Sequence, residues 1–179
     1  MQIIRKWNQY ISNAKQELHN IRSLSGASIL VTLNAIISYF RIQVSNILEI
    51  SFASIMVGVC GFLYGPILTG IAGIVADIIK FITRSTGSFF PGFTLNEFLL
   101  GFIYGCFFYK KEITLKRVIL ARITIVILIN LILTPIWLNI LYGSSLLEIP
   151  RIIKNIVLFP VDVTLLYIVL QTAKRIHRK

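Results

Sequence analysis

Long apolar runs constrain the fold of this chain more than any other feature of its sequence. Residues 123–133 (ITIVILINLIL) are almost wholly apolar, and comparable runs recur along the 179 residues. Only 14% of the chain is charged, whereas a soluble domain carries about 25% charged residues to hydrate its surface. Membrane β-barrels would show alternating segments of about 10 residues instead of continuous runs. We therefore predict an all-α integral membrane protein.

Six of these runs are predicted to be transmembrane helices. A helix needs about 20 residues to cross a bilayer, and several runs approach that length. The predicted spans lie at about residues 26–42, 50–64, 66–82, 95–109, 118–141 and 155–173. Pro135 is expected to kink the fifth span, because proline interrupts helical hydrogen bonding. The sequence thus predicts a bundle of six transmembrane helices.

The two ends of the chain differ from this bundle in composition. Residues 1–24 place apolar side chains at helical spacing among basic ones. This pattern is typical of an amphipathic helix at a membrane surface, although a partly ordered tail fits equally well. Residues 25–175 are predicted to form the transmembrane domain, and residues 176–179 a basic tail.

The distribution of basic residues predicts the orientation of the bundle. The net charge of +11 would favour a nucleic-acid partner in a soluble protein, but here Lys and Arg lie at the ends of apolar runs. With six spans, thirteen of the 18 Lys and Arg, Arg122 among them, fall on the side of both termini and the loop 110–117. The other five are Arg41, Lys80, Arg84, Arg151 and Lys154. Because cytoplasmic loops are rich in Lys and Arg, we predict a multi-pass cell-membrane protein with both termini cytoplasmic.

Several polar residues fall inside the apolar runs. Asp77 and Lys80 are three apart in one predicted helix, so they share a face and are placed to pair. Asp162 and Asn130 also lie within spans. A charge at the bilayer centre costs about 2.5–3.5 kcal/mol, so these groups need partners or a wet cavity. They either satisfy one another between helices or line a ligand cavity.

The outward ends of the spans combine basic and aromatic residues. The segment 84–94 (RSTGSFFPGFT) supplies three phenylalanines on a short loop, which would close over a ligand as a lid or cap the bundle itself. The whole group comprises Arg41, Arg84, Arg151, Lys154, Phe89, Phe90, Phe93 and Trp137. Such a group suits a planar aromatic ligand with a carboxylate, since rings stack and guanidinium groups bind carboxylates bidentately. An interfacial aromatic belt with snorkelling basic residues would have the same composition.

Motifs for catalysis are missing from the sequence. It contains no His-Glu-x-x-His, no phosphate-binding Gly-x-x-x-x-Gly-Lys-Ser/Thr and no Gly-x-Ser-x-Gly. We therefore expect neither an enzyme nor a bound metal or cofactor. A transporter of this kind would depend on an ion gradient or on a partner ATPase. A lipid-modifying enzyme, a small secondary transporter and a structural subunit without a ligand are the alternatives.

Residues 61–105 carry a recognisable set of short motifs. They include Tyr64-Gly65-Pro66, Ala76-Asp77-Ile78-Ile79 and Phe89-Phe90-Pro91-Gly92-Phe93-Thr94. Further along lie WLNILYG at 137–143 and PRIIKN at 150–155. With these motifs, residues 20–175 resemble the substrate-binding S components of energy-coupling factor (ECF) vitamin transporters. Within that family the chain most resembles the folate-specific members.

The resemblance implies a bundle of six helices that binds a vitamin with high affinity in a cavity open to the outside. It also implies partners, namely a transmembrane coupling subunit (EcfT) and two cytoplasmic ATPase subunits. Small residues on the first helix of S components contact the coupling subunit in an alanine-x-x-x-alanine pattern. The matching positions here are Ser28 and Thr32, with Ala27 and Ala35 beside them.

The resemblance to folate-specific members also assigns ligand-binding roles. In those proteins, basic residues on the first helix and near the last helix bind the glutamate part of folate. Arg151 matches the second region, whereas the first falls at the uncharged Asn34, so either Arg41 substitutes for it or that contact is absent. We expect Phe89, Phe90 and Phe93 to close over the ligand rings and Arg84 and Arg151, with Lys154 beside them, to bind carboxylate. Asp77, Asn130 and Asn155 would bond the polar ring edge. Pantothenate or riboflavin is the alternative ligand.

Overall fold

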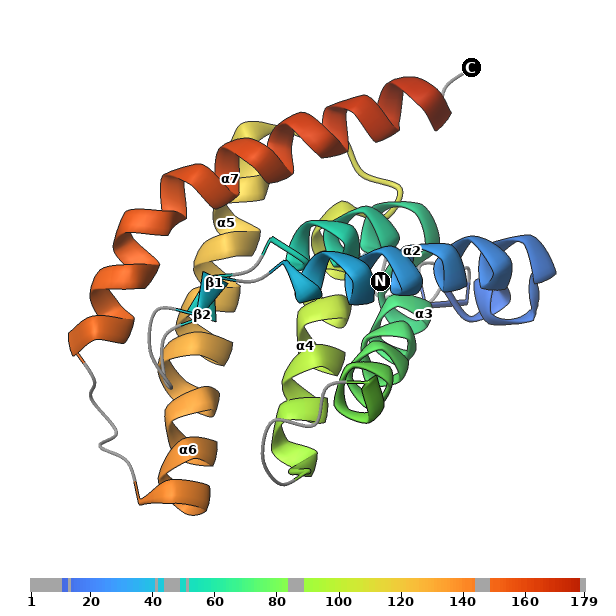
Figure 1. Ribbon diagram of the computed structural model, residues 1–179. Helices are drawn as coiled ribbons and strands as arrows, with labels where there is room; N and C mark the ends of the chain where they lie inside the picture. Colours follow the sequence, from blue (N-terminus) through green and yellow to red (C-terminus); the bar gives the residue numbers. More distant parts are fainter. Residues whose placement is uncertain are drawn as a thin grey trace, which may run out of the picture.

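Helices make up almost all of the structure. The computed structural model describes residues 11–12, 14–40, 42–43, 49–50, 52–83, 89–143 and 149–177 (Figure 1). In chain order, its elements are η1 (Glu17–His19), α2 (Ile21–Tyr39), β1 (Ile42–Gln43), β2 (Glu49–Ile50), α3 (Ser54–Thr83), α4 (Pro91–Phe108), α5 (Leu115–Ile125), η2 (Val126–Leu133), α6 (Thr134–Tyr142) and α7 (Ile149–His177). The prediction of an all-α fold is confirmed, apart from the two-residue antiparallel pair of β1 and β2.

A sharp break divides α3 into two helical segments, 54–64 and 66–83. Gly65 has φ 81° and ψ 179°, a conformation outside the helical region. Glycine adopts positive φ without steric penalty, and Pro66, which has no N–H, suits the first turn of the next helix. The ring of Tyr109 covers Gly65 so closely that a Cβ there would lie 3.2 Å from it. The sequence correctly predicts separate helices on either side of Tyr64-Gly65-Pro66.

Helices α3 and α4 pack almost backbone to backbone. A Cβ on Gly105 would lie 2.2 Å from the Cα of Pro66, and one on Gly101 would lie 2.4 Å from the carbonyl oxygen of Thr69. Small residues permit such close approach between membrane helices, where packing rather than the hydrophobic effect holds helices together. This tight pair is the centre of the molecule, and the other helices are arranged around it.

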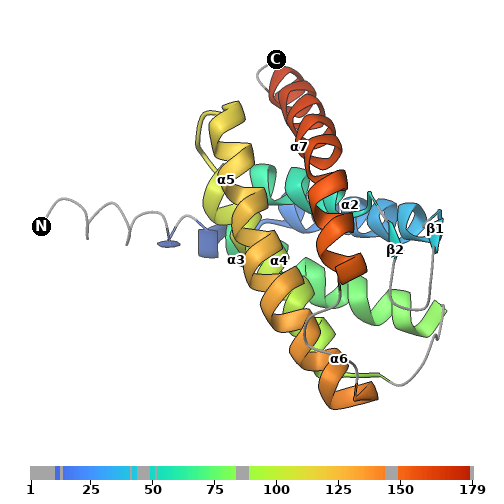
Figure 2. The same cartoon turned by 90° about the vertical axis from the view of Figure 1, so that its left-hand side faces the viewer.

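The fifth predicted span is one long rod, built from α5, η2 and α6 (Figure 2). Its middle, Val126–Leu133, is a π-helix, and Pro135 follows in the first turn of α6. Proline removes one helical hydrogen bond and clashes with the carbonyl four residues earlier. A wider π turn relieves that clash, and π segments often occur at functional sites. The backbone is helical at Leu133 and Thr134, so a π segment stands next to Pro135 where the sequence predicted a kink.

Four helices are long and apolar enough to cross a membrane, among the residues that the structure describes. They are Ile21–Tyr39, Ser54–Thr83, Leu115–Tyr142 and Ile149–Ile176. Helix α4 has 18 residues and includes Asn96 and Glu97, which lowers its hydropathy. In both views α2 runs across the direction of the α5–α6 rod (Figures 1 and 2). The structure thus supports a helical membrane protein.

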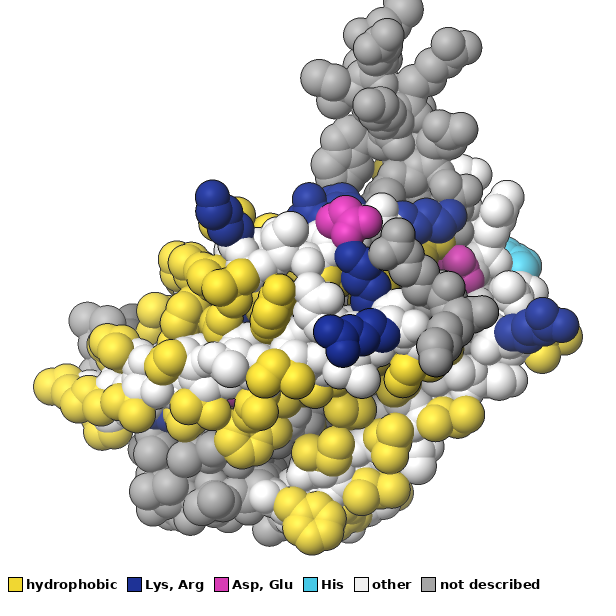
Figure 3. Space-filling model, turned by 90° about the horizontal axis from the view of Figure 1, so that it is seen from above, with side chains coloured by type: hydrophobic (Ala, Val, Ile, Leu, Met, Phe, Trp, Pro, Cys, Tyr) yellow, Lys and Arg dark blue, Asp and Glu magenta, His cyan; other side chains and the backbone are white. Residues whose placement is uncertain are grey.

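Three segments distant in sequence meet on one side of the molecule. The Tyr109 hydroxyl donates a 2.8 Å hydrogen bond to Glu17, just before α2. The amide of Gln171 donates to the carbonyl of Ile113 at 3.1 Å, and Lys174 pairs with Glu112. Figure 3 shows the molecule from above, with Lys and Arg side chains across this face and hydrophobic side chains bordering them. The start of α2, the loop 109–114 and the end of α7 therefore lie close together.

Candidate functional site

A cavity of about 610 Å³ lies between α2, α3 and α4 on one side and the α5–α6 rod and α7 on the other. Its walls carry apolar side chains, such as Leu100, Ile125 and Leu158, and interleaved polar ones. Along the rod the lining positions are Arg122, Ile125, Ile129, Asn130, Thr134, Leu138 and Tyr142. The step from Ile129 to Thr134 runs through the end of the π segment into the first residue of α6, and the lining positions stay on one side of the rod. A concave cavity in which polar groups converge among apolar side chains is a common form of small-molecule site.

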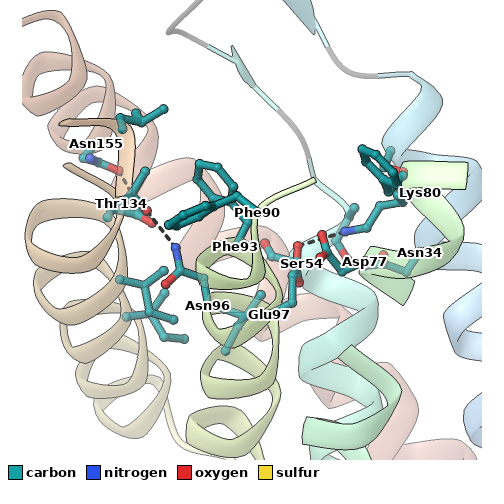
Figure 4. Close-up of a pocket in the computed structure, with 18 of the residues that line it drawn as sticks. Asn34, Ser54, Asp77, Lys80, Phe90, Phe93, Asn96, Glu97, Thr134 and Asn155 are labelled. Carbon is teal, nitrogen blue, oxygen red and sulfur yellow. Dashed lines mark hydrogen bonds and ion pairs between the residues drawn. The ribbon is translucent and has the colours of Figure 1, made fainter. Parts of the chain in front are cut away.

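Polar pairs connect α3 to α4 beside the cavity (Figure 4). The Thr94 hydroxyl donates a 2.7 Å hydrogen bond to Asp77. The ammonium group of Lys80 lies 2.8 Å from a carboxylate oxygen of Glu97, and both side chains are about one quarter exposed. The sequence places Asp77 and Lys80 on a shared face, and the structure shows each of them bonded to α4. Asp77 and Lys80 therefore have bonding partners on a neighbouring helix, and both residues also line the cavity.

The phenylalanines of the predicted lid lie against aromatic rings of the bundle. The ring centroid of Phe89 is 5.2 Å from that of Phe81, in an edge-to-face arrangement. Phe90 lies 6.0 Å from Phe93 and 5.7 Å from Trp137. All three phenylalanines also line the cavity, Phe93 from the first turn of α4. Their rings therefore pack on the bundle and border the cavity.

A hydrogen-bonded chain fixes the position of Trp137 between α4 and α6. Its indole N–H donates to the side-chain oxygen of Asn96 at 3.1 Å. The Asn96 amide in turn donates to the hydroxyl of Thr134 at 3.2 Å, as Figure 4 shows. Asn96 is only 7% exposed, and a buried amide needs such partners. The chain holds Trp137 where Phe90 can pack on it.

An ion pair that the sequence did not predict lies at the other end of the cavity. Arg122 of α5 pairs with Asp162 of α7 and donates a 3.1 Å hydrogen bond to the Tyr104 hydroxyl. Arg122 is 7% exposed, and both charged residues line the cavity. From the sequence, Arg122 is counted among the charges of the cytoplasmic side, and the structure shows that its side chain is buried in the bundle. The available signal was the single acidic residue, Asp162, inside the last apolar run, since a buried carboxylate requires a cationic partner.

The remaining predicted binding residues fall into three groups. Asn34 is buried, lines the cavity and donates a 2.8 Å hydrogen bond to the carbonyl of Ala53. Asn130 donates to Asn155 at 2.9 Å across the cavity wall, and Lys154 lines the same region. Arg151 is 7% exposed and is not one of the cavity-lining residues of the described chain. Arg41 and Arg84 lie outside the described residues.

The predicted partner-contact residues occupy two faces of α2. Ala27 and Ala35 are buried, at 3% and 7% exposure. Ser28 and Thr32 lie on the exposed face. Their hydroxyls bond to carbonyls of the preceding turn, Leu24 at 2.9 Å and Ser28 at 3.0 Å. The exposed pair is therefore small and already satisfied in its hydrogen bonding.

Most of the chain is similar in sequence to known proteins of one family. The family model for the ECF transporter substrate-specific component matches residues 22–170. A folate transporter FolT of Clostridium novyi is 37% identical over 142 residues, which cover 78% of this chain and 83% of that protein. Another FolT, of Leuconostoc mesenteroides, is 29% identical over 151 residues, covering 80% of this chain and 81% of the relative.

A solved structure gives the same relationship in three dimensions. The crystal structure of FolT bound with folic acid superimposes with a TM-score of 0.80 at 39% sequence identity. The match covers 86% of this chain and 95% of that chain. Sequence and fold agree over the same region, and the resemblance inferred from the motifs is confirmed. This chain belongs to the family of substrate-specific components of ECF transporters.

Proposed function

We propose that this S component captures folate in the cavity between α3–α4 and the α5–α6 rod. The observation that carries the proposal is a polar and aromatic cavity in a chain whose 39% identical structural relative is the FolT bound with folic acid. Folate combines two ring systems with a carboxylate-bearing tail. A cavity that has phenylalanines at one end and basic residues near them suits such a molecule.

The proposed ligand contacts follow the cavity wall. Phe89, Phe90 and Phe93 cover the rings, since offset and edge-to-face aromatic contacts are favourable. Arg84, Arg151 and Lys154 are the cations proposed for the glutamate carboxylates, and Arg41 is a further candidate. Asp77, Asn130 and Asn155 offer hydrogen bonds to polar ring atoms. No metal or cofactor takes part, and the protein acts by binding and not by catalysis.

We further propose that the chain crosses the cell membrane six times with both termini in the cytoplasm. Six helical segments of the described chain support this topology: α2, the two halves of α3, α4, the α5–α6 rod and α7. The face formed by the loop 109–114 and the end of α7 carries Lys110, Lys111, Lys116, Lys174 and Arg175. Basic loops favour the cytoplasmic side, so the phenylalanine end of the cavity would open outward.

The proposed partners are the coupling subunit EcfT and two cytoplasmic ATPases, which together supply the energy for import. The sequence has no nucleotide-binding motif of its own. Ser28 and Thr32 on the exposed face of α2 are the proposed contacts with EcfT. Close helix packing in membranes favours small residues at the interface, and this pair meets that requirement.

Binding of folate to the purified protein tests the ligand. Isothermal titration in detergent should give saturable binding of one folate per chain, and riboflavin and pantothenate should give no heat of binding. If folate and its reduced forms show no affinity while another vitamin binds, the ligand assignment fails. Uptake in cells should also require the ATPase subunits, whereas dependence on an ion gradient alone would favour a secondary transporter.

A further inference from the structure

The inner end of the cavity contains a charged cluster whose hydrogen bonding is incomplete. We propose that Asp162, held in place by Arg122 and Tyr104, accepts hydrogen bonds from the amino-pyrimidine edge of the pterin ring. This inference rests on the proposed function, because it assigns one end of the ligand to one subsite. It would make Asp162 the residue that distinguishes pterins from vitamins without such an edge.

The geometry of Asp162 leaves one side of its carboxylate available. Oxygen Oδ2 accepts from Nη2 of Arg122, and no donor among the described residues reaches Oδ1. The Asp162 side chain retains 14% exposure and lines the cavity. This oxygen is not among the buried unpaired atoms of the described residues, so it is accessible from the cavity. A ligand with N–H groups could donate to it there.

Arg122 is also incompletely satisfied. Nη1 donates to Tyr104 at 3.1 Å and Nη2 to Asp162, while the buried Nε has no acceptor among the described residues. A guanidinium has five N–H donors, so both terminal nitrogens keep a further proton to donate. A purely architectural ion pair is stable only when its remaining donors and acceptors are satisfied. Because Arg122 and Asp162 both line the cavity, a ligand there could use the donors and acceptors that the pair leaves free.

The chemistry of a pterin matches that opening. Its 2-amino group and N3–H lie side by side and donate in the same direction, and the adjacent 4-oxo group accepts. A carboxylate next to a guanidinium presents the complementary acceptors and donors, and charge-assisted bonds of this kind are the strong ones. Ile125 and Ile129, one and two turns along the rod from Arg122, give the subsite apolar walls.

The other carboxylates of the cavity fit this role less well. Asp77 is bonded by the neutral Thr94 hydroxyl, and Glu97 is paired with Lys80. Both lie on the α3–α4 side, on the segments adjoining the phenylalanine loop. A lysine ammonium is a point charge without the planar fork that matches a ring edge. The Arg122–Asp162 cluster presents that fork.

The proposal is tested by measuring the affinities of two ligands for the wild-type protein and for variants of it. The ligands are folate and the folate analogue in which a methyl group replaces the 2-amino group. The wild-type protein should bind folate at least about tenfold more tightly than the analogue, as loss of a bond to a charged group implies. In Asp162→Asn the preference should fall below about threefold. The matched variant Glu97→Gln, which neutralises a cavity carboxylate to which no ligand contact is assigned, should keep the wild-type preference.

Asp162→Asn leaves the buried charge of Arg122 without its partner, which could destabilise the fold. A second variant therefore controls for this destabilisation. The double variant Arg122→Gln/Asp162→Asn is neutral at both positions and should likewise lose the preference for folate. Wild-type protein that binds both ligands equally, or an Asp162 variant that keeps the full preference, would overturn the inference. A folded variant that binds neither ligand would give the cluster an architectural role and overturn it too. Failure of wild-type protein to bind folate at all would instead refute the proposed function.

Discussion

The basic residues at the start of α7 differ in their access to the cavity. Arg151 lies in the first turn and is 7% exposed, and its carbonyl accepts a 3.0 Å hydrogen bond from Asn155. Lys154 lies three residues later and lines the cavity. A ligand carboxylate can reach a cation only where its head group borders the cavity. Of these two residues, Lys154 is therefore the better placed for direct contact.

Replacing Lys154 should affect only ligands that carry the glutamate tail. In Lys154→Ala, folate affinity should fall about tenfold or more, since a hydrogen bond to a charged group contributes about 1.5–3 kcal/mol. Affinity for pteroate, which lacks the glutamate, should stay within about twofold of wild type. Titration of both ligands measures this difference. If Arg151→Ala shows the glutamate-specific loss and Lys154→Ala does not, the carboxylate lies at Arg151 instead.

Individual residues were predictable from sequence where the motif itself forms the cavity wall. Asp77, Phe89, Phe90, Phe93 and Asn155 all line the cavity, as the sequence led us to expect. Arg122 was not predictable, because it lies seven residues after the start of α5, about 10 Å along a helix. A count of charges by side cannot tell whether such a residue turns to the surface or inward. That depends on α7, which supplies Asp162 from 40 residues away.

At the scale of elements, glycines set the distance between α3 and α4. Gly61, Gly73, Gly101 and Gly105 all lie where a Cβ would meet backbone atoms of the opposite helix at 2.2 to 2.8 Å. Gly58 differs, because its Cβ would meet only the end of the Leu166 side chain, at 2.6 Å. A flexible side-chain tip can move aside, whereas a helix backbone cannot do so without separating the pair.

Two matched substitutions test this packing. Gly105→Ala should lower the free energy of unfolding by about 1–3 kcal/mol, as overpacking of a close interface does. Gly58→Ala should be much milder, since alanine is favoured over glycine in helices by up to about 1 kcal/mol and Leu166 can rearrange. Thermal unfolding in detergent measures both. Equal destabilisation by the two variants would contradict the backbone-contact argument.

The sequence predicted where elements begin and end better than how they are built. The Tyr64-Gly65-Pro66 break was evident because glycine and proline have local conformational preferences. The π segment of η2 was not evident, because its eight residues, VILINLIL, read as an ordinary apolar helix. The short β1–β2 pair was missed for a similar reason, since two-residue strands carry no periodic signal. Domain boundaries at residues 24 and 175 stay a prediction.

At the scale of the whole molecule, the proposed topology places two exposed sites on opposite sides of the membrane. Glu112 lies in the loop between α4 and α5, and its side chain is 76% exposed. Tyr142 ends α6 and is 65% exposed. The helical rod between them has 28 residues, about 42 Å at 1.5 Å per residue, which exceeds the thickness of the hydrocarbon core.

Cysteine labelling tests that topology directly. In a background where Cys60 and Cys106 are replaced by serine, Tyr142→Cys should react with a membrane-impermeant maleimide on intact cells. Glu112→Cys should react only after the cells are permeabilised. The reverse pattern would invert the proposed orientation. Labelling of both positions from the same side would contradict a membrane crossing between them.

The exposed face of α2 is where the whole molecule would meet its coupling subunit. Thr32 is small, and its hydroxyl is bonded to the Ser28 carbonyl at 3.0 Å, so no polar group there requires a partner. Thr164 of α7 offers a matched site, since it is also exposed and its hydroxyl bonds the Pro160 carbonyl at 2.7 Å. Both threonines are therefore exposed and have hydroxyls bonded within their own helix, and only Thr32 is a proposed contact with the coupling subunit.

Replacing Thr32 or Thr164 by a larger side chain should distinguish assembly with the coupling subunit from folate binding. Thr32→Leu should prevent co-purification with the coupling subunit and abolish folate uptake, because a bulky side chain keeps two membrane helices apart. Folate affinity should stay within about twofold of wild type, since Thr32 is not one of the cavity-lining residues. Thr164→Leu should leave both assembly and uptake intact. If Thr164→Leu disrupts assembly and Thr32→Leu does not, the coupling face lies on α7, and the small-residue argument for α2 fails.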